Sequence, residues 1–173
     1  MTDKSPLAGK RILAVDDERD ILGLLTELLP MCQVVTADSF EAAEALMASQ
    51  EFDLAILDIM GVDGYGLLEV AKGKGIPAAM LTAHAFTPKN LVRSIKEGAV
   101  AYIPKEELSH IVKFLEDILT AEKEGRSPWE PWQKRLPSSY FEKRWGAAWR
   151  DVEDEFWIRF KASIRARRDA SSP

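Results

Sequence analysis

Five polar residues of the sequence each stand at the end of a short apolar run. Asp16 and Asp17 follow the first run, Asp58 the third, Thr82 ends the fourth, and Lys105 follows the fifth. If these residues met in space, three crowded carboxylates would repel one another unless a cation relieved the repulsion. A few hard oxygen ligands suit Mg²⁺, and Mg²⁺ with a lysine ammonium can neutralise a transferring phosphoryl group. The predicted chemistry is attack by the Asp58 carboxylate on phosphorus, giving an acyl phosphate.

The pattern of apolar residues between positions 11 and 120 predicts five strand–helix repeats. The expected strands are Arg11–Val15, Gln33–Ala37, Leu54–Leu57, Pro77–Leu81 and Ala101–Ile103. They are apolar without alternation, which is typical of a parallel sheet covered by helices on both faces. In a doubly wound sheet of this kind the ligand site lies at the carboxyl ends of the strands. The five polar residues should therefore meet at one edge of the sheet.

Four segments carry a resemblance to a known family. AVDDE (14–18), AILDIM (55–60), MLTA (80–83) and AYIPK (101–105) occur in this order at the expected strand ends. Together they resemble the receiver domain of bacterial two-component response regulators, over about residues 9–120. The resemblance implies an α/β, flavodoxin-like fold with a five-stranded parallel sheet in the order 2-1-3-4-5. It also implies a response regulator that takes a phosphoryl group from a histidine kinase or a phosphotransfer protein.

The resemblance also assigns the acceptor and the metal ligands. It implies that Asp58 is the phosphoacceptor and that Asp17 binds Mg²⁺ directly. Asp16 would bind mainly through water, and the backbone carbonyl of Met60 would be a further ligand. From the residues alone, Asp16 and Asp17 could instead cap the first helix, because acids favour helix N-termini.

The remaining family positions concern the phosphoryl group and the switch. Thr82 and Lys105 would act with Asp58 by contacting the phosphoryl group. Tyr102 matches the aromatic switch residue of the fifth strand and would act together with Thr82. Aromatic residues are also common in strands for packing alone, so both interpretations of Tyr102 stay open.

The loop after Asp58 departs from the family pattern. The family usually has a longer loop that contains a proline, whereas here IMGV leads straight to Asp63–Gly64, two residues sooner. This puts the local geometry around Met60 in doubt, although no catalytic residue is missing. It keeps open an alternative function as an interaction module whose pocket is never phosphorylated.

Composition and charge change sharply near residue 121. Residues 1–120 have a net charge of −8, residues 121–173 have +3, and all five tryptophans lie in the second segment. The single cysteine, Cys32, allows no internal disulfide and fits a reducing compartment. With no signal-peptide core in residues 1–10 and no membrane-length apolar run, we expect a cytoplasmic protein with no membrane association.

The C-terminal segment carries no motif of an enzymatic effector. Residues 121–139 contain three prolines and predict a linker, and residues 140–168 predict one amphipathic helix that starts at a Ser139–Glu142 capping box. Its apolar stripe includes the expected interface residues Phe141, Trp145, Trp149 and Phe156. Such a stripe should pack on its own receiver, form a homodimer or bind a partner protein.

The basic end of the predicted helix offers a further alternative. Arg165, Arg167 and Arg168 could contact phosphates, as in a transcriptional regulator. Nucleic acid is nevertheless an unexpected partner, because no two-helix, zinc-ligand or winged DNA-reading pattern is present. The sequence therefore favours a stand-alone receiver that signals through protein–protein contacts and has no separate enzymatic activity.

Overall fold

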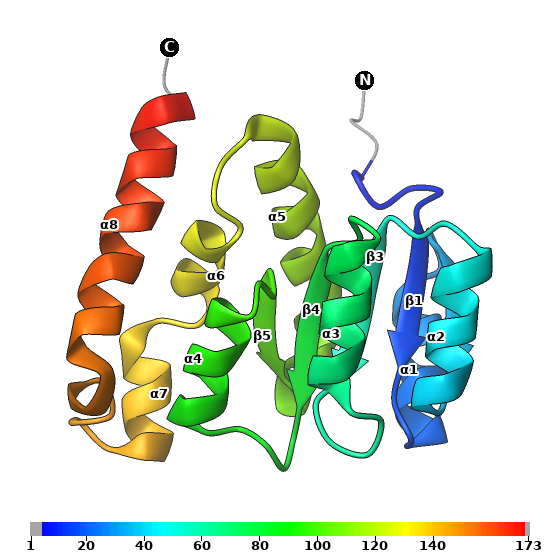
Figure 1. Cartoon of the computed structure of the whole chain (residues 1–173), viewed down its shortest axis with the longest axis horizontal. Helices are drawn as coiled ribbons and strands as arrows, with labels where there is room; N and C mark the ends of the chain where they lie inside the picture. The colour runs from blue at the N-terminus through cyan, green and yellow to red at the C-terminus, as the bar shows by residue number, and fades with distance from the viewer. Residues whose placement is uncertain (1–4, 172–173) are drawn as a thin grey trace.

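The chain folds into a five-stranded parallel sheet with helices on both faces and a group of helices beyond one edge (Figure 1). The computed structural model describes residues 5–171, apart from the side chains of Val152 and Ser171. The strands are β1 (Arg11–Val15), β2 (Gln33–Ala37), β3 (Leu54–Asp58), β4 (Ala78–Thr82) and β5 (Ala101–Pro104), in the order β2-β1-β3-β4-β5. The predicted fold class and strand order are confirmed.

The helices follow the predicted alternation with the strands. They are α1 (Arg19–Leu28), α2 (Phe40–Ser49), α3 (Gly64–Gly73), α4 (Pro88–Lys96), the 3₁₀ helix η1 (Lys105–His110) and α5 (Ile111–Glu124). Local signals fix two of their starts: the Ser39 hydroxyl accepts from the Ala42 amide, and the Thr87 hydroxyl accepts from the Asn90 amide. In the part of the chain that the structure describes, no helix has the length and apolar character needed to cross a bilayer.

The central strands are buried on both faces, as their uniform apolar sequence predicts. Every residue of β3 and β4 is buried, and the pairing aligns Asp58 with Leu81 and Thr82 with Pro104. This register places the carboxyl ends of β3, β4 and β5 beside one another. The fold therefore brings the predicted site residues to one edge of the sheet, as expected for a parallel arrangement.

The C-terminal segment differs from the prediction. Part of the expected linker (121–139) is helical, because α5 continues to Glu124 and α6 spans Trp129–Arg135. The expected single helix (140–168) is wrong: the structure has α7 (Ser138–Trp145), a 3₁₀ turn η2 (Asp151–Glu153) and α8 (Asp154–Ser171). Gly146 has a φ of 87°, a left-handed conformation that glycine adopts freely and that ends the helix.

The predicted capping box at the start of this segment is also wrong. The helix α7 already begins at Ser138, before the expected start, and no side chain caps its first turn. Ser139 therefore lies inside the helix, whereas the Ser138 hydroxyl lies 3.4 Å from a Glu142 carboxylate oxygen.

The extension covers the open edge of the sheet. Figure 1 shows α6, α7 and α8 on the far side of β5 from the rest of the sheet. The indole N–H of Trp129 donates to the carbonyl of Ala99 (3.0 Å), and that of Trp132 donates to the carbonyl of Tyr102 (2.8 Å). Because an edge strand otherwise presents unpaired carbonyls, Trp132 satisfies one carbonyl of β5, and Trp129 satisfies that of Ala99 just before the strand.

Candidate functional site

A lysine at the end of β5 connects the carboxylates at the ends of β1 and β3. The ammonium of Lys105 lies 2.8 Å from an Asp16 carboxylate oxygen, 3.1 Å from Glu18 and 3.5 Å from Asp58. Asp16 is fully buried, and the side chains of Asp58 and Lys105 are 7% and 9% exposed. The structure thus brings together these predicted site residues from three different strand ends.

The buried carboxylates have altered proton affinities. Burial, reinforced by the charge of Asp16, raises the pKa of Asp58 to about 7, and Lys105 opposes this rise. Burial also raises the pKa of Asp16, against the hydrogen bond from Lys105. For Lys105, burial lowers the pKa, but hydrogen bonds to Asp16 and Glu18 outweigh it and raise the pKa overall. Counted as ionised groups, the carboxylates of Asp16, Glu18 and Asp58 around Lys105 carry more negative charge than this ammonium neutralises.

The carboxylates at the start of α1 form a group suited to a cation. Asp16, Asp17 and Glu18 each offer a carboxylate oxygen, and these oxygens all lie within 4.8 Å of one another. Asp17 and Glu18 are exposed, so the group opens to solvent. Oxygen donors of this kind, beside the excess negative charge of the site, fit a hard divalent cation such as Mg²⁺.

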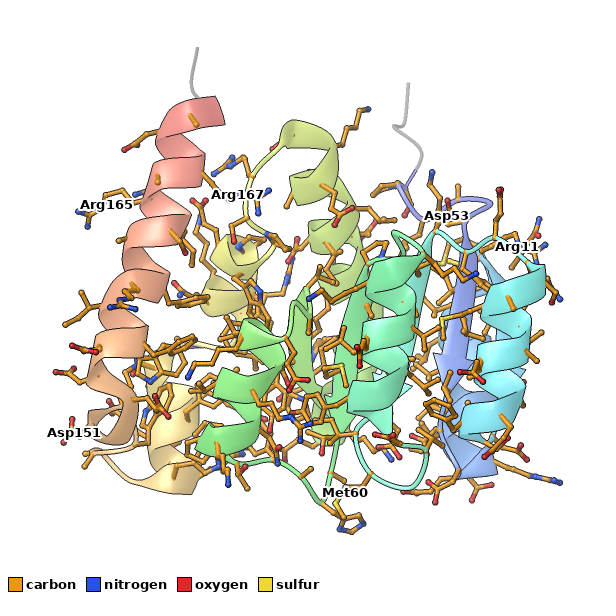
Figure 2. All side chains as sticks on the ribbon, viewed as in Figure 1. Arg11, Asp53, Met60, Asp151, Arg165 and Arg167 are labelled. Atoms are coloured by element: carbon orange, nitrogen blue, oxygen red, sulfur yellow. The ribbon has the colours of Figure 1, made fainter. Side chains whose placement is uncertain are left out.

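The loop after Asp58 runs close to this carboxylate group. Gly61 has a φ of 88°, and a Cβ atom placed on it would lie 2.5 Å from a carboxylate oxygen of Asp17. The backbone next to Met60 therefore approaches Asp17, whereas the Met60 side chain is 54% exposed and lies at the rim of the molecule (Figure 2). This arrangement is compatible with a role for the Met60 carbonyl rather than for its side chain.

The short loop is closed by specific backbone contacts. The amide of Gly64 donates to the carbonyl of Ile59 (3.1 Å), and Val62 is buried in the core. Asp63 adopts a left-handed conformation (φ 51°) and accepts a hydrogen bond from the Gly66 amide, which caps α3. Glycine is required at position 64, because a Cβ there would lie 2.2 Å from the Asp58 carbonyl oxygen.

Thr82 and Tyr102 meet through the loop of residues 83–87, which we call the β4–α4 loop. The Thr82 hydroxyl accepts from the Ala85 amide (2.9 Å), and the Tyr102 hydroxyl donates to the Ala85 carbonyl (2.8 Å). The Tyr102 hydroxyl also accepts from the Thr87 amide (3.0 Å). Tyr102 is fully buried, and burial raises the pKa of its hydroxyl. The two expected switch residues thus hold the same loop.

The expected interface residues lie in one aromatic cluster on the same chain. Phe141 is buried to 1% exposure, and its ring lies 4.9 Å from that of Trp145 and 5.3 Å from that of Trp149. Phe156 is half-buried and packs beside Trp157. Of the basic residues nearby, Arg165 projects away from the body of the molecule and Arg167 toward α6 (Figure 2). Packing of the extension on its own receiver, one of the three expected arrangements, is present in this structure.

Sequence reasoning missed three residues that the geometry includes. Glu18 binds Lys105, but in the sequence it is indistinguishable from an ordinary acid at a helix start. Phe86 and Glu106 contact α7, and no local pattern marks either as a junction with a segment far along the chain. The adjacency of Glu106 to Lys105 was the only available signal.

Comparison with known proteins settles the family. The sequence matches the model for the response regulator receiver domain over residues 12–116, which includes four of the five strands in full, β1 from its second residue on, and every strand-end residue described above. The chain belongs to this family. The matched part of the receiver domain ends before α6, so the helices of the extension lie outside it.

Individual relatives of the receiver domain agree with this result. The two-component response regulator ARR10 of Arabidopsis thaliana is 38% identical over 120 residues, which cover 63% of this chain and 21% of that protein. The chain thus spans about a fifth of the length of this curated relative. A response regulator receiver domain protein (CheY-like) from Methanospirillum hungatei is 32% identical, with a TM-score of 0.57 over 66% of this chain and 99% of that one. A response regulator from Thermotoga maritima, 23% identical with a TM-score of 0.58 over 65% of this chain and 98% of that one, shows the same fold.

Proposed function

We propose that this receiver accepts a phosphoryl group on Asp58 from a histidine kinase or a phosphotransfer protein and signals through protein–protein contacts. The observation that carries the proposal is the position of Lys105, whose ammonium lies within 3.5 Å of Asp58 and 2.8 Å of Asp16 at the edge where Thr82 also ends its strand. The family and its curated relatives, which are named as two-component response regulators, support it.

The proposed step is a displacement at phosphorus. An oxygen of the Asp58 carboxylate attacks, the P–N bond to the donor imidazole breaks, and its electron pair leaves with the imidazole nitrogen, which takes up a proton. Lys105 is positioned to neutralise charge on the phosphoryl oxygens, and the Thr82 hydroxyl to hydrogen-bond one of them. The exclusion of water by the buried strand ends strengthens both interactions.

Mg²⁺ is the proposed cofactor. Asp16, Asp17, Asp58 and the backbone carbonyl of Met60 would hold it, and the first two belong to the cation-suited carboxylate group at the start of α1. When bound, it would offset the negative charge of the carboxylates and of the phosphoryl group. Without a divalent cation, the raised pKa of Asp58, about 7, keeps a substantial part of this nucleophile protonated near neutral pH.

Phosphorylation of the full chain by a small-molecule donor tests the proposal. We expect acetyl phosphate with Mg²⁺ to add the mass of one phosphoryl group, measured by intact-mass spectrometry, and the Asp58→Asn variant to gain none. The matched control is Asp53→Asn. Asp53 lies just before β3, so it is at the opposite end of that strand from Asp58 (Figure 2). An unmodified wild type, with no Mg²⁺ binding that depends on Asp17 and Asp58, would instead support the phosphorylation-silent interaction module.

The output of the receiver is proposed to be a change in protein assembly. A homodimer through the C-terminal helices remains a prediction, and so does capture of a separate protein. Light scattering after size exclusion, with and without beryllofluoride and Mg²⁺, distinguishes these outcomes. A mass change that requires Asp58 would support control of assembly by the site.

A further inference from the structure

The helix α7 contacts the two segments that directly follow the proposed phosphoryl-binding residues Thr82 and Lys105. On one side, the indole N–H of Trp145 donates to the Phe86 carbonyl (3.2 Å) in the β4–α4 loop, which follows Thr82. On the other side, the Tyr140 hydroxyl donates to the Glu106 carboxylate (2.6 Å), directly after Lys105. An element of the extension therefore bridges the two strand ends of the site.

The contact with the β4–α4 loop is mostly aromatic and partly buried. The ring of Phe86 lies 4.7 Å from Trp145 and 5.9 Å from Phe141, and it stacks on Tyr102 at 5.6 Å with an interplanar angle of 8°. Aromatic pairs in such geometry contribute about 0.5–1.5 kcal/mol beyond their buried area. The Glu106 side chain is 52% exposed, so its pair with Arg144 adds little energy by comparison. Phe86 is the main connection between loop and extension.

Two residues of the candidate site, Thr82 and Tyr102, form hydrogen bonds with the same loop. Its Ala85 amide donates to Thr82 and its Ala85 carbonyl accepts from Tyr102. Among the hydrogen bonds formed within residues 5–171, the Thr82 hydroxyl is an acceptor only, so its own hydrogen can be donated to a phosphoryl oxygen without breaking the bond from Ala85. Such chains of hydrogen bonds polarise and strengthen one another. A phosphoryl group on Asp58 should therefore stabilise the loop conformation to which α7 is docked.

From these contacts we infer that the C-terminal extension is an intramolecular reader of the site: phosphorylation of Asp58 and docking of α7 on the β4–α4 loop stabilise each other. The inference rests on the proposed function and adds the direction of the coupling. When Asp58 is phosphorylated, α7 binds the β4–α4 loop more strongly and does not detach from it. The two sites share one element, the β4–α4 loop, and linkage requires that each strengthen the other by the same factor. Coupling of this kind typically amounts to about 5- to 150-fold.

Amide hydrogen exchange of the full chain tests one direction of the coupling. The probe is beryllofluoride with Mg²⁺, which stands in for the phosphoryl group. We expect the amides of α7 to exchange at least about fivefold more slowly when the probe is bound. Unchanged or faster exchange in α7, with probe binding that requires Asp58, would overturn the inference and leave the proposed function intact. Absence of any Asp58-dependent binding would overturn both.

The reverse direction is tested by loosening the docked helix. Trp145→Ala removes the ring that packs on Phe86, and Trp145→Phe keeps an aromatic ring but removes the hydrogen bond to the Phe86 carbonyl. The readout is the beryllofluoride concentration that gives half-maximal thermal stabilisation at fixed Mg²⁺. We expect this concentration to rise at least about fivefold in the alanine variant and by a smaller factor in the phenylalanine variant.

The matched control is Trp149→Phe. Trp149 packs on Phe141, Trp145 and Trp157, and within the described residues it makes no ring contact or hydrogen bond with residues 83–87. Its substitution should leave the half-maximal concentration within about twofold of the wild type. If folded Trp145→Phe and Trp145→Ala proteins both bind the probe like the wild type, the extension does not read the site.

Discussion

Replacing Asp58 by asparagine should make the free energy of unfolding less dependent on pH. In the folded chain the pKa of Asp58 is raised from 3.8 to about 7 by burial and by the nearby Asp16. The folded protein therefore keeps this proton over a pH range in which the unfolded chain releases it. A carboxyl group with a raised folded pKa stabilises the fold at low pH, and this stabilisation is lost as pH rises toward about 7.

The size of the effect follows from these two values. Between pH 5 and pH 8, in the absence of divalent cations, the wild type should lose about 2–3 kcal/mol of stability through Asp58 alone. The asparagine side chain of the variant has no proton to release and should not show this loss. We therefore expect the variant to gain about 2–3 kcal/mol relative to the wild type over that interval, although it removes a partner of Lys105.

Urea unfolding in the presence of EDTA at several pH values between 5 and 8 measures this difference. Asp53→Asn is the matched control, because its exposed carboxylate lies at the opposite edge of the sheet. Saturating Mg²⁺ at pH 8 should raise the free energy of unfolding of the wild type. The increase should be smaller in the Asp58→Asn variant. If the free energies of unfolding of the wild type and of Asp58→Asn change with pH in parallel, the folded-state pKa of Asp58 is not raised and the reasoning is refuted.

Three further substitutions probe the site, the extension and the loop after Asp58. Lys105→Met leaves two buried carboxylates without their cation, so we expect a loss of about 2–4 kcal/mol at pH 8 in EDTA and a smaller loss at pH 5, by urea unfolding. Phe141→Ala opens the aromatic cluster and should cost about 3–5 kcal/mol; a loss below about 1 kcal/mol in the same measurement would mean that the cluster is not packed. Gly64→Ala should cost about 1–3 kcal/mol or more because its Cβ meets the Asp58 carbonyl at 2.2 Å. The control Gly23→Ala, exposed inside α1 with no atom within 4 Å of its Cβ, should instead stabilise by about 0.5–1 kcal/mol, and equal effects at the two glycines would contradict the close approach at Gly64.

The receiver fold could be predicted because its local signals agree with its global arrangement. Runs such as Leu54–Leu57 are apolar without alternation, which points to strands covered on both faces, and four of the five runs end at a polar residue of the candidate site. Ser39 and Thr87 are residue types that favour helix N-caps, and in the structure they cap α2 and α4. The meeting of Lys105 with Asp16 and Asp58 then follows from parallel topology alone.

The extension could not be predicted to the same degree. Aromatic residues recur at helical spacing on both sides of Gly146, so periodicity alone predicts a continuous helix through it. The chain breaks at Gly146, which has a positive φ and separates Trp145 from Trp149, and Trp145 packs on Phe86, a residue far away in the sequence. Trp145 and Phe86 are 59 residues apart in the sequence. Neither the residues around Trp145 nor those around Phe86 show a local pattern that indicates their contact.

The tryptophans that cover β5 also have a consequence for biosynthesis. The chain is made from its N-terminus, so the whole sheet leaves the ribosome before Trp129 and Trp132 reach the carbonyls of Ala99 and Tyr102. During that interval the nascent receiver has an open strand edge, to which a neighbouring extended chain can add. A chain cut short between α5 and α6 would therefore contain every residue of the candidate site but would keep an open strand edge, prone to associate with other nascent chains.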